Sequence, residues 1–315
     1  MQTTFEIAPF DNCAFRDEMT KAKAHISVCI CTYKRPDPLK RLLDALSVQE
    51  TNGLFTYSIV VVDNDYTESA RVVATSVTIP LKYCVEPRQN ISLARNKAVE
   101  NATGNFVAFI DDDEVPVNKW LLMLLKTLLQ YKVDGVLGPV KPDFDEAAPQ
   151  WVIKGGFYDR PEHPTGLVLE WSKCRTGNVL LNRQLLIDNT PPFRPEFLSG
   201  EDQDFFQRMI EKKHVFVWCH EAVAYEAVPA VRWKRGFLVR RALLRGFFSL
   251  RNRRSSLRPI VESLIAVPTY VVALPLGLVL GQATFMSYVF KLFYFVGRLF
   301  ALVGINPIRQ PYVTD

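Results

Sequence analysis

Phe106-Val-Ala-Phe-Ile-Asp-Asp-Asp-Glu114 is the stretch that decides the fold class of this chain, because an apolar strand runs directly into four carboxylates. Open α/β sheets bind their ligands outside the carboxyl ends of their strands. Carboxylates this close raise one another's pKa, and a bound divalent cation relieves the repulsion. Hard oxygen ligands suit Mg²⁺ or Mn²⁺. We therefore expect a metal-assisted phosphate site at the end of this strand.

The sequence on both sides of this stretch alternates between strand and helix patterns. The expected strands are 25–31, 58–62, 81–85, 106–110, 135–140, 178–182, 215–219 and 222–225. The expected helices are one that begins with Asp37 as N-cap and Pro38 in its first position, 68–74, 92–100, 118–131 and one after 200–204. This alternation predicts an α/β fold with a doubly wound, mostly parallel sheet.

The charge and the hydrophobic residues are unevenly distributed toward the C-terminus. The whole chain has a formal charge of +5, yet residues 232–258 hold ten Lys and Arg and no acidic residue. Residues 263–290 contain no charged residue, which exceeds the roughly 20 apolar residues that cross a bilayer core. A second apolar stretch, 283–304, carries only Lys291 and Arg298 as charges. We predict a C-terminal membrane-associated helical hairpin, either spanning or re-entrant.

Basic residues beside an apolar segment mark the cytoplasmic side of a membrane and attract anionic headgroups. Two other interpretations stay open: a buried helix pair in a soluble protein, and nucleic-acid binding by the basic run. Aromatic nucleic-acid motifs of known type are missing, so we expect a membrane and no nucleic acid as a partner. The expected parts are an N-terminal extension at 1–24, a catalytic domain at 25–230, a basic amphipathic linker at 231–260, the membrane hairpin at 261–304 and a tail at 305–315.

The N-terminus and the cysteines predict a cytoplasmic catalytic part. The first 25 residues contain Glu6, Asp11, Asp17 and Glu18 and no apolar segment, so we expect no secretory leader. The six cysteines show no paired-ligand spacing. We expect them to be reduced thiols of the core.

Five short motifs occur in the order and spacing typical of glycosyltransferase family 2. They are Val28-Cys-Ile-Cys-Thr-Tyr-Lys-Arg35, Val60-Val-Val-Asp-Asn-Asp65, Ser92-Leu-Ala-Arg-Asn96, Phe109-Ile-Asp-Asp-Asp113 and Gly200-Glu-Asp202. The chain resembles this family over about residues 25–230, and within it the bacterial exopolysaccharide repeat-unit transferases of the succinoglycan glucosyltransferase type. The resemblance implies a GT-A fold and a nucleotide-diphosphate sugar as donor, commonly a uridine one.

The resemblance also assigns residues to the nucleotide. It implies that Thr32, Tyr33 and Arg35 lie around the nucleobase, that Asp63 accepts from the base edge, and that Arg95 faces the nucleotide. An ionised Asp is a strong acceptor for an N–H donor. Two alternatives remain open: Asp63 as a turn or cap residue, and Arg95 as an ion-pair partner of a carboxylate such as Asp111.

In the acidic cluster, the resemblance places Asp111 on the ribose or the metal and Asp113 on the metal that bridges the diphosphate oxygens. Asp112 is assigned to the nucleotide sugar. The alternative is a solvated acidic loop that caps the following helix, in which Asp112 and Glu114 have only that role. Glu226 and His220 are candidates for a further metal ligand, because many relatives have a His where this chain has Tyr225-Glu226.

Asp202 matches the catalytic base of the family, which implies a single displacement that inverts the anomeric carbon. The open alternative is that it caps the helix at Gln203. Candidates for the acceptor side are Glu201, Arg175, Asn178 and Trp171, with Trp151 as a second aromatic that could stack on a sugar or pack in the core.

The function we expect is metal-dependent, inverting sugar transfer to a polyprenyl-diphosphate-linked oligosaccharide at the cytoplasmic face of a bacterial inner membrane. Arg232-Trp233 resembles the Gln-x-x-Arg-Trp signature of processive synthases, but Pro229 stands in the Gln position, which favours addition of one sugar. A sugar nucleotidyltransferase would need a Gly-rich loop after the first strand, and a dehydrogenase would need Gly-x-Gly-x-x-Gly. Cys31-Thr32-Tyr33-Lys34 after the first strand is not such a loop. The alternatives to the transferase are an inactive nucleotide-binding membrane scaffold and, less favoured for want of that loop, a sugar nucleotidyltransferase.

Overall fold

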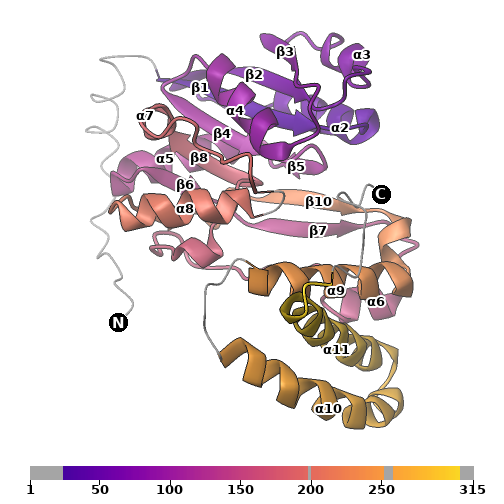
Figure 1. Ribbon diagram of the computed structural model, residues 1–315. Coiled ribbons are helices and arrows are strands. Elements are labelled where there is room, and N and C mark those ends of the chain that lie inside the picture. The colour runs from indigo at the N-terminus through magenta and orange to yellow at the C-terminus, as the bar shows by residue number, and fades with distance from the viewer. Residues whose placement is uncertain (1–23, 198–199, 252–257, 306–315) are drawn as a thin grey trace. The chain divides into compact units, whose positions relative to one another are not determined.

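The computed structural model describes residues 24–197, 200–251 and 258–305 (Figure 1). Cys13, nearly all of the expected N-terminal extension and all but the first residue of the expected tail lie outside these ranges. The described residues form two compact units. The first contains residues up to 141 and residues 160–227, and the second contains residues 142–159 and those from 228 onward. The domain boundaries expected from the sequence stay predictions.

The first unit is built on a seven-stranded sheet with the order β3-β2-β1-β4-β8-β6-β9. All neighbouring strands are parallel except β8, which runs antiparallel to β4 and to β6. The mostly parallel sheet expected from the sequence is confirmed. Its strands are β1 Ala24–Thr32, β2 Phe55–Asp63, β3 Leu81–Val85, β4 Phe106–Ile110, β6 Gly135–Leu137, β8 Asn178–Asn182 and β9 Phe216–Trp218.

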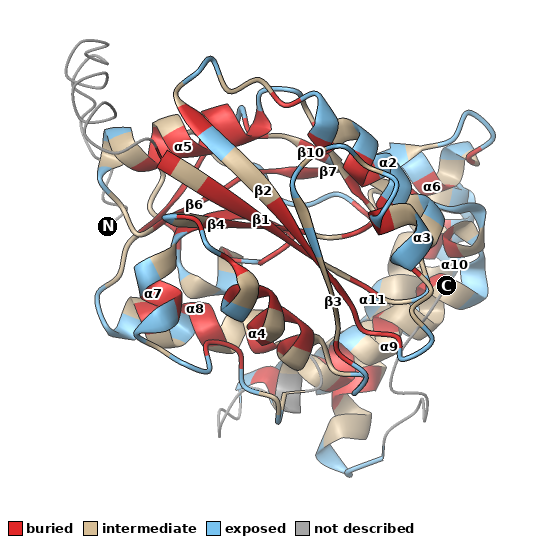
Figure 2. Cartoon of the chain, turned by 90° about the horizontal axis from the view of Figure 1, so that it is seen from above, coloured by how far each residue is buried: buried red, intermediate tan, exposed pale blue. Residues whose placement is uncertain are grey.

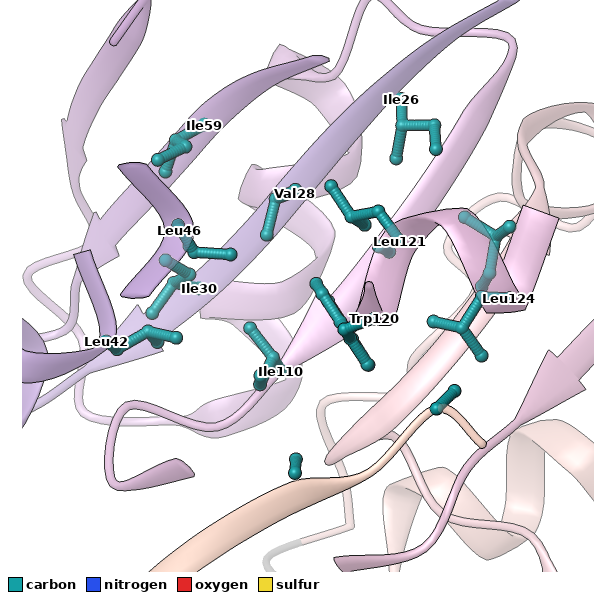
Figure 3. Close-up of a cluster of buried hydrophobic side chains, with 14 of the residues drawn as sticks. Ile26, Val28, Ile30, Leu42, Leu46, Ile59, Ile110, Trp120, Leu121 and Leu124 are labelled. Atoms are coloured by element: carbon teal, nitrogen blue, oxygen red, sulfur yellow. The ribbon is translucent and has the colours of Figure 1, made fainter. Parts of the chain in front are cut away.

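Helices cover both faces of this sheet, because alternate side chains of each strand belong to two different cores. On one face, Ile26, Val28 and Ile30 of β1 pack with the leucines of α2 and with Trp120 of α5 (Figure 3). On the other face, Cys29 packs with the alanines of α4 and the phenylalanines of α8. Figure 2 shows the buried strands between these helices. The helices of this unit are α2 Pro36–Ser47, α3 Arg71–Ala74, α4 Ile91–Asn101, α5 Trp120–Tyr131, α7 Arg183–Ile187, α8 Glu201–Glu211 and the 3-10 turn η1 Trp171–Lys173.

The strand register brings the ends of the sequence motifs to one edge of the sheet. Thr32 at the end of β1 pairs with Asp63 at the end of β2, and Asp63 pairs with Val85 at the end of β3. β4 ends at Ile110, directly before the acidic cluster. The carboxyl ends of parallel strands therefore carry the candidate residues, as expected for this class of sheet.

A second sheet, with the order β5-β10-β7, was not anticipated as such. Its strands are β5 Glu114–Pro116, β7 Val140–Phe144 and β10 Ala224–Val228. β10 runs antiparallel to β5 and places Glu226 opposite Glu114. The strand expected at 135–140 is thus split into β6 and the start of β7. Glu114, which the alternative interpretation of the acidic cluster placed in a solvated loop, lies buried in a strand.

The start of α2 also differs from the expectation. The helix begins at Pro36 with Arg35 as N-cap, so the expectation of Asp37 as N-cap is wrong. Pro36 has no N–H to satisfy and a φ already set for a helix, which makes it a suitable first residue. Asp37 instead contributes a carboxylate to the first helical turn.

The second unit is helical. It contains α6 Gln150–Lys154, the 3-10 turn η2 Ala230–Trp233, α9 Arg235–Arg251, α10 Arg258–Val279 and α11 Gln282–Leu302. α10 and α11 are long and apolar enough to cross a membrane, judged by length and composition. In the apolar 18-residue stretch of each helix, only 11% of the residues of α10 and 17% of those of α11 are buried. This low burial contradicts the alternative of a buried helix pair.

Candidate active site

The acidic cluster lies on the turn between β4 and β5, with β10 opposite. Glu114 is 1% exposed, and its Oε2 accepts from the backbone N–H of Asp111 at 3.4 Å. The carbonyl of Asp113 accepts from the N–H of Ala227, the residue after Glu226. Strand pairing therefore gathers carboxylates from two distant parts of the chain. Asp111, Asp113, Glu114 and Glu226 form what we call the carboxylate cluster.

Gly177 leaves the space between two of these carboxylates open. A Cβ added to Gly177 would lie 2.8 Å from Oε1 of Glu114 and 2.9 Å from Oδ2 of Asp111. Both distances are below van der Waals contact, so only glycine fits without moving the carboxylates. The Arg-Thr-Gly-Asn stretch was expected to contribute Arg175 and Asn178, and its glycine was missed.

Three arginines surround the cluster. Arg35 lies 3.5 Å from Asp112 and 3.2 Å from Asp113. Arg160 pairs with Glu226 and lies 3.8 Å from Oε1 of Glu114. Arg95, the third, joins Asp111 to the start of α8. Arg160 lies in an irregular segment with no motif around it, so nothing in the sequence pointed to it.

Burial raises the pKa of three carboxyl groups. The pKa of Asp112 rises to about 7 through burial and repulsion by Asp113, with Arg35 opposing. The pKa of Asp111 rises to about 6 through the partial burial of its carboxyl group and repulsion by Asp113, with Arg95 opposing. The pKa of Glu114 lies well above its usual range for the same reason, burial first and Asp111 second. Because the side chain of Asp111 is 47% exposed, solvent screens its charge more than that of Asp112 or Glu114.

The donor set fits a hard divalent cation. Oε1 of Glu114 is a buried oxygen without a hydrogen-bond donor, although Arg160 lies near it. Buried carboxylates of this kind are stabilised by an ion, and oxygen donors suit Mg²⁺ or Mn²⁺. In the described ranges, however, no group of three His, Cys, Asp or Glu is already arranged around one point as metal ligands.

The residues expected around the nucleobase follow β1 and β2. The hydroxyl of Thr32 donates to Asp112 at 2.7 Å, and Lys34 lies over the ring of Tyr33. Asp63 is fully buried, and its carboxylate accepts from the N–H of Asp65, the N–H of Ala70 and the hydroxyl of Tyr83, at 3.0, 2.8 and 2.9 Å. These bonds use three of about four acceptor positions of a carboxylate. Asp63 therefore holds the turn after β2, as the turn alternative expected.

Arg95 connects Asp111 to the helix that carries Asp202. Its guanidinium donates to buried Glu201, the first residue of α8, and lies 3.7 Å from Asp111. Gly200 precedes the helix with φ +84°, a left-handed conformation that suits glycine. Of the two roles expected for Arg95, the structure shows the ion pair with carboxylates, because Asp111 and Glu201 lie at the same guanidinium.

Asp202 is the second residue of α8, so the alternative that it caps a helix beginning at Gln203 is wrong. Oδ1 of Asp202 accepts from the N–H of Gln203 at 2.7 Å. The negative charge of Asp202 also helps to raise the pKa of Arg95, after Glu201 and Asp111. Asp202 and Asp111 therefore act on the same guanidinium.

Other expected residues lie elsewhere or have structural partners. The imidazole of His220 lies 3.5 Å from Glu162, and the backbone N–H of His220 donates to the hydroxyl of Thr165. His220 therefore contacts other residues than those of the carboxylate cluster. Glu226 is held by Arg160. The indole of Trp151 packs at 6.0 Å from the ring of Phe157, in the second unit.

The remaining acceptor-side candidates precede or begin β8. Asn178 is buried, and its amide accepts from Trp120 Nε1 at 2.7 Å and donates to the carbonyls of Pro139 and Ala222 at 3.0 and 2.8 Å. Its side chain is thus fully used inside the fold. Arg175 is exposed, and its guanidinium lies 3.0 Å from the side-chain amide of Gln203, beside Asp202. Trp171 packs against the core that contains α8.

Comparison with known proteins agrees with this geometry. The family model for glycosyl transferase family 2 matches residues 27–188. The chain is 34% identical over 239 residues to the succinoglycan biosynthesis protein ExoM of Rhizobium meliloti (strain 1021), covering 72% of this chain and 75% of that protein.

Two solved structures share the fold. The mannosyltransferase PcManGT from Pyrobaculum calidifontis, in complex with GDP-Man and Mn²⁺, matches with a TM-score of 0.59 at 17% identity, over 95% of this chain and 90% of that one. S. aureus TarS 1-349 in complex with UDP-GlcNAc matches with a TM-score of 0.50 at 18% identity, over 90% and 93%. At these identities the likeness shows the fold alone. The chain therefore belongs to glycosyltransferase family 2, with an α/β GT-A fold, and is a glycosyltransferase.

Proposed function

We propose that this glycosyltransferase moves one sugar from a UDP-sugar to a lipid-linked oligosaccharide, with inversion and with a divalent cation, during synthesis of a surface polysaccharide. The observation that carries the proposal is the position of Arg95, which joins Asp111 at the end of β4 to Glu201 beside Asp202. This links the carboxylates suited to a diphosphate–metal complex with the candidate base.

The donor site in this proposal lies at the carboxyl edge of the sheet. Thr32 ends β1, Tyr33 and Arg35 follow it, Asp63 ends β2, and Asp112 accepts from Thr32. A nucleotide sugar as donor is supported by the family and by the ligands of the two structures, GDP-Man and UDP-GlcNAc. The choice of uridine rests on the resemblance of the motifs.

Asp111 and Asp113 would hold the cation, with Glu114 as a further oxygen donor and Gly177 keeping the space between Asp111 and Glu114 open. When bound, a divalent cation offsets the negative charge of the departing nucleoside diphosphate. Arg35 and Arg160 hold Asp113 and Glu226 in place. Glu226 is then a partner of Arg160 first and a candidate ligand second.

Asp202 is the proposed catalytic base. It would take the proton from the acceptor hydroxyl as that oxygen attacks the anomeric carbon opposite the leaving group. Glu201 keeps Arg95 in place and is itself a positioning residue. On the acceptor side, Arg175 contacts Gln203, the residue after Asp202, and these two are the candidates for contacts with the acceptor sugar.

The acceptor and the location follow from the second unit and from the relatives. Because ExoM is a succinoglycan biosynthesis protein, we assign this chain to exopolysaccharide synthesis, with a polyprenyl-diphosphate-linked glycan as acceptor. The apolar helices α10, which is mostly exposed, and α11, which is mostly half-buried, support attachment to the cytoplasmic face of the inner membrane. A membrane-bound enzyme meets such an acceptor at a high effective concentration.

The test is release of nucleotide from a panel of UDP-sugars by membranes that contain the protein, with lipid-linked acceptor, with and without EDTA. We expect the wild type to release nucleotide with one donor, EDTA to abolish release, and Asp113→Ala and Asp202→Asn to lower kcat by 10²-fold or more. Equal release by all three proteins would refute the residue assignments. Undiminished release in EDTA would refute the metal.

A further inference from the structure

α10 carries an exposed apolar stripe along one side. The stripe consists of Val261, Leu264, Ile265, Val272, Leu276 and Val279, which are between 52% and 83% exposed, and Val271 and Leu278, 51% and 64% exposed, widen it on one flank. These positions recur at the spacing of one helical face. An apolar surface of this length on a single helix marks a contact with a membrane or another partner. How α10 and α11 lie relative to a bilayer depends on their packing against α9 and on the charges that these helices carry.

α11 packs lengthwise against α9, and the two helices run in the same direction (Figure 1). Leu238 near the start of α9 shares a buried cluster with Met286 near the start of α11. Farther along, a Cβ added to Gly246 of α9 would lie 1.9 Å from the carbonyl oxygen of Tyr294 of α11. A Cβ added to Gly297 of α11 would likewise lie 2.2 Å from the carbonyl oxygen of Leu243 of α9. A glycine on each helix allows the two backbones to come into contact, so the sequence itself favours this close pairing of α9 with α11.

Arg298 ties all three helices together at one end. Its guanidinium donates to Ser249 of α9 at 3.1 Å, to Glu262 of α10 at 3.3 Å and to Tyr294 of α11 at 2.9 Å. Arg298 is buried, so losing any of these partners is costly. α9, α10 and α11 therefore move as one body, and α11 lies at the same depth in a membrane as α9.

Charges at the middle of both helices decide the orientation. Arg245 lies near the middle of α9, Lys291 lies near the middle of α11, and both are exposed. If the hairpin crossed the bilayer, α9 would cross beside α11 and both cations would face hydrocarbon. A charged side chain at the centre of a bilayer is costly. A hairpin that lies flat can keep both cations at the headgroups.

We propose that the three helices form a platform that enters only one leaflet of the membrane. α10 lies in the plane of the membrane, with its apolar stripe in the part of the acyl region next to the headgroups. The occupant of the stripe is an anionic phospholipid bilayer. Arg258 at the start of α10 has a side chain 85% exposed and pairs with Glu262, and the ammonium of Lys291 lies over the ring of Tyr270 of α10. Both cations lie on or beside α10 and match anionic headgroups. This inference rests on the membrane attachment within the proposed function, and it is independent of the donor and the acceptor.

The first experiment is flotation of the full chain with vesicles of phosphatidylcholine and phosphatidylglycerol in a 3:1 ratio. The variant carrying Ile265→Asp and Val272→Asp should lose at least nine tenths of the floated fraction. Val72→Asp is the matched control, because Val72 is 80% exposed, like Val272 at 79%, but lies in α3 of the other unit. Failure of the wild type to float would refute the membrane attachment itself. Equal flotation of all variants would refute the stripe as the contact surface.

The second experiment measures depth and separates the platform from a spanning hairpin. Val261→Cys, Val272→Cys and Val279→Cys each receive a nitrobenzoxadiazole label, and quenching by shallow and deep spin-labelled lipids reports the depth. Wild type carried through the same labelling gives the background from the native cysteines. A flat helix places all three labels at the same shallow depth.

In a spanning helix, Val272 would lie up to about 16 Å deeper than Val261, from the 1.5 Å rise per residue. That result, with flotation intact, would overturn the platform while leaving the proposed glycosyl transfer untouched.

Discussion

Arg95 and Glu201, separated by 106 positions in the chain, form a buried ion pair between α4 and the first residue of α8. Their side chains are 10% and 8% exposed. The same guanidinium lies 3.7 Å from Asp111, so one arginine sets the position of the helix that carries Asp202 relative to the carboxylate cluster. A buried pair of this kind contributes more to specificity of arrangement than to net stability.

Removing one partner of this pair should therefore damage both stability and activity. Arg95→Ala leaves Glu201 buried without its partner, and we expect a loss of about 3–5 kcal/mol in the free energy of unfolding. The matched variant that removes both, Arg95→Met with Glu201→Met, should regain most of this stability but not the activity, because Asp111 and Asp202 are no longer held together. Chemical denaturation and the rate of sugar transfer check the two effects separately. Recovery of full activity in the double variant would show that the pair does not position the site.

Gly177→Ala should weaken activation by the metal. The added Cβ meets Glu114 and Asp111 below van der Waals contact, so the two carboxylates must separate. We expect kcat/KM to fall by about 10²-fold, because small misplacements of catalytic groups have effects of this size. The concentration of Mn²⁺ or Mg²⁺ for half-maximal activity should rise as well.

Gly236→Ala is the control for Gly177→Ala, because an added Cβ there meets nothing within 4 Å. It should leave both the rate and the metal response unchanged. A normal metal titration in Gly177→Ala would contradict the role of Gly177.

In EDTA, the stability of the protein should fall as the pH rises from about 4 to 7. The unfolded pKa values of Asp and Glu are about 4, whereas burial raises the pKa of Asp112 to about 7 and that of Glu114 well above its usual range. Between these values the folded state holds more protons than the unfolded chain, so the free energy of unfolding decreases with rising pH, by up to about 1.4 kcal/mol per pH unit for each such proton. Thermal unfolding at fixed ionic strength measures this slope.

Asp112→Asn should flatten that slope, because it removes one of the titrating groups, and added Mn²⁺ should raise the unfolding temperature most at pH 7 and above. Stability that increases steadily from pH 4 to 7 in EDTA, in both proteins, would contradict the direction of these pKa shifts.

Asn178→Ala should act on stability and not on the acceptor. The substitution leaves Trp120 Nε1 and the carbonyls of Pro139 and Ala222 without their partner inside the fold. Each buried polar group left unpaired costs about 1–3 kcal/mol, so we expect a loss of about 3 kcal/mol or more. The KM for the acceptor, measured below the unfolding transition, should stay within a factor of two. Arg175→Ala provides the contrast. Because Arg175 is exposed, this substitution should raise the KM for the acceptor and have little effect on stability.

The sheet could be predicted from the sequence because each strand is a short apolar run with its own local signal. The runs at 81–85, 106–110 and 178–182 are strands in the structure with the same bounds. Helix starts were less predictable. Both Asp37 and Asp202 have the side chain of an N-cap, but Pro36 and Gly200 make each helix begin two residues earlier than such a cap would imply.

The partners of the candidate residues depend on contacts between distant segments, which no local pattern encodes. Asp63 belongs to a recognisable motif, yet its three hydrogen bonds come from its own turn and from Tyr83 on the next strand. His220 and Glu226 were equal candidates in the sequence. Strand pairing puts Glu226 opposite Glu114, whereas His220 lies beside Glu162.

The sequence by itself determined the fold class, the family and the edge of the sheet that carries the site, because hydrophobic periodicity and ordered motifs are local properties. Only the tertiary structure decided which charges meet. It brought Arg95 to Glu201 and Asp111, Arg160 to Glu226, and α9 beside α11, since ion pairs and helix packing depend on which surfaces the folded chain brings together. The same folding placed α11, a segment with the composition of a membrane span, against α9, a helix that carries several arginines.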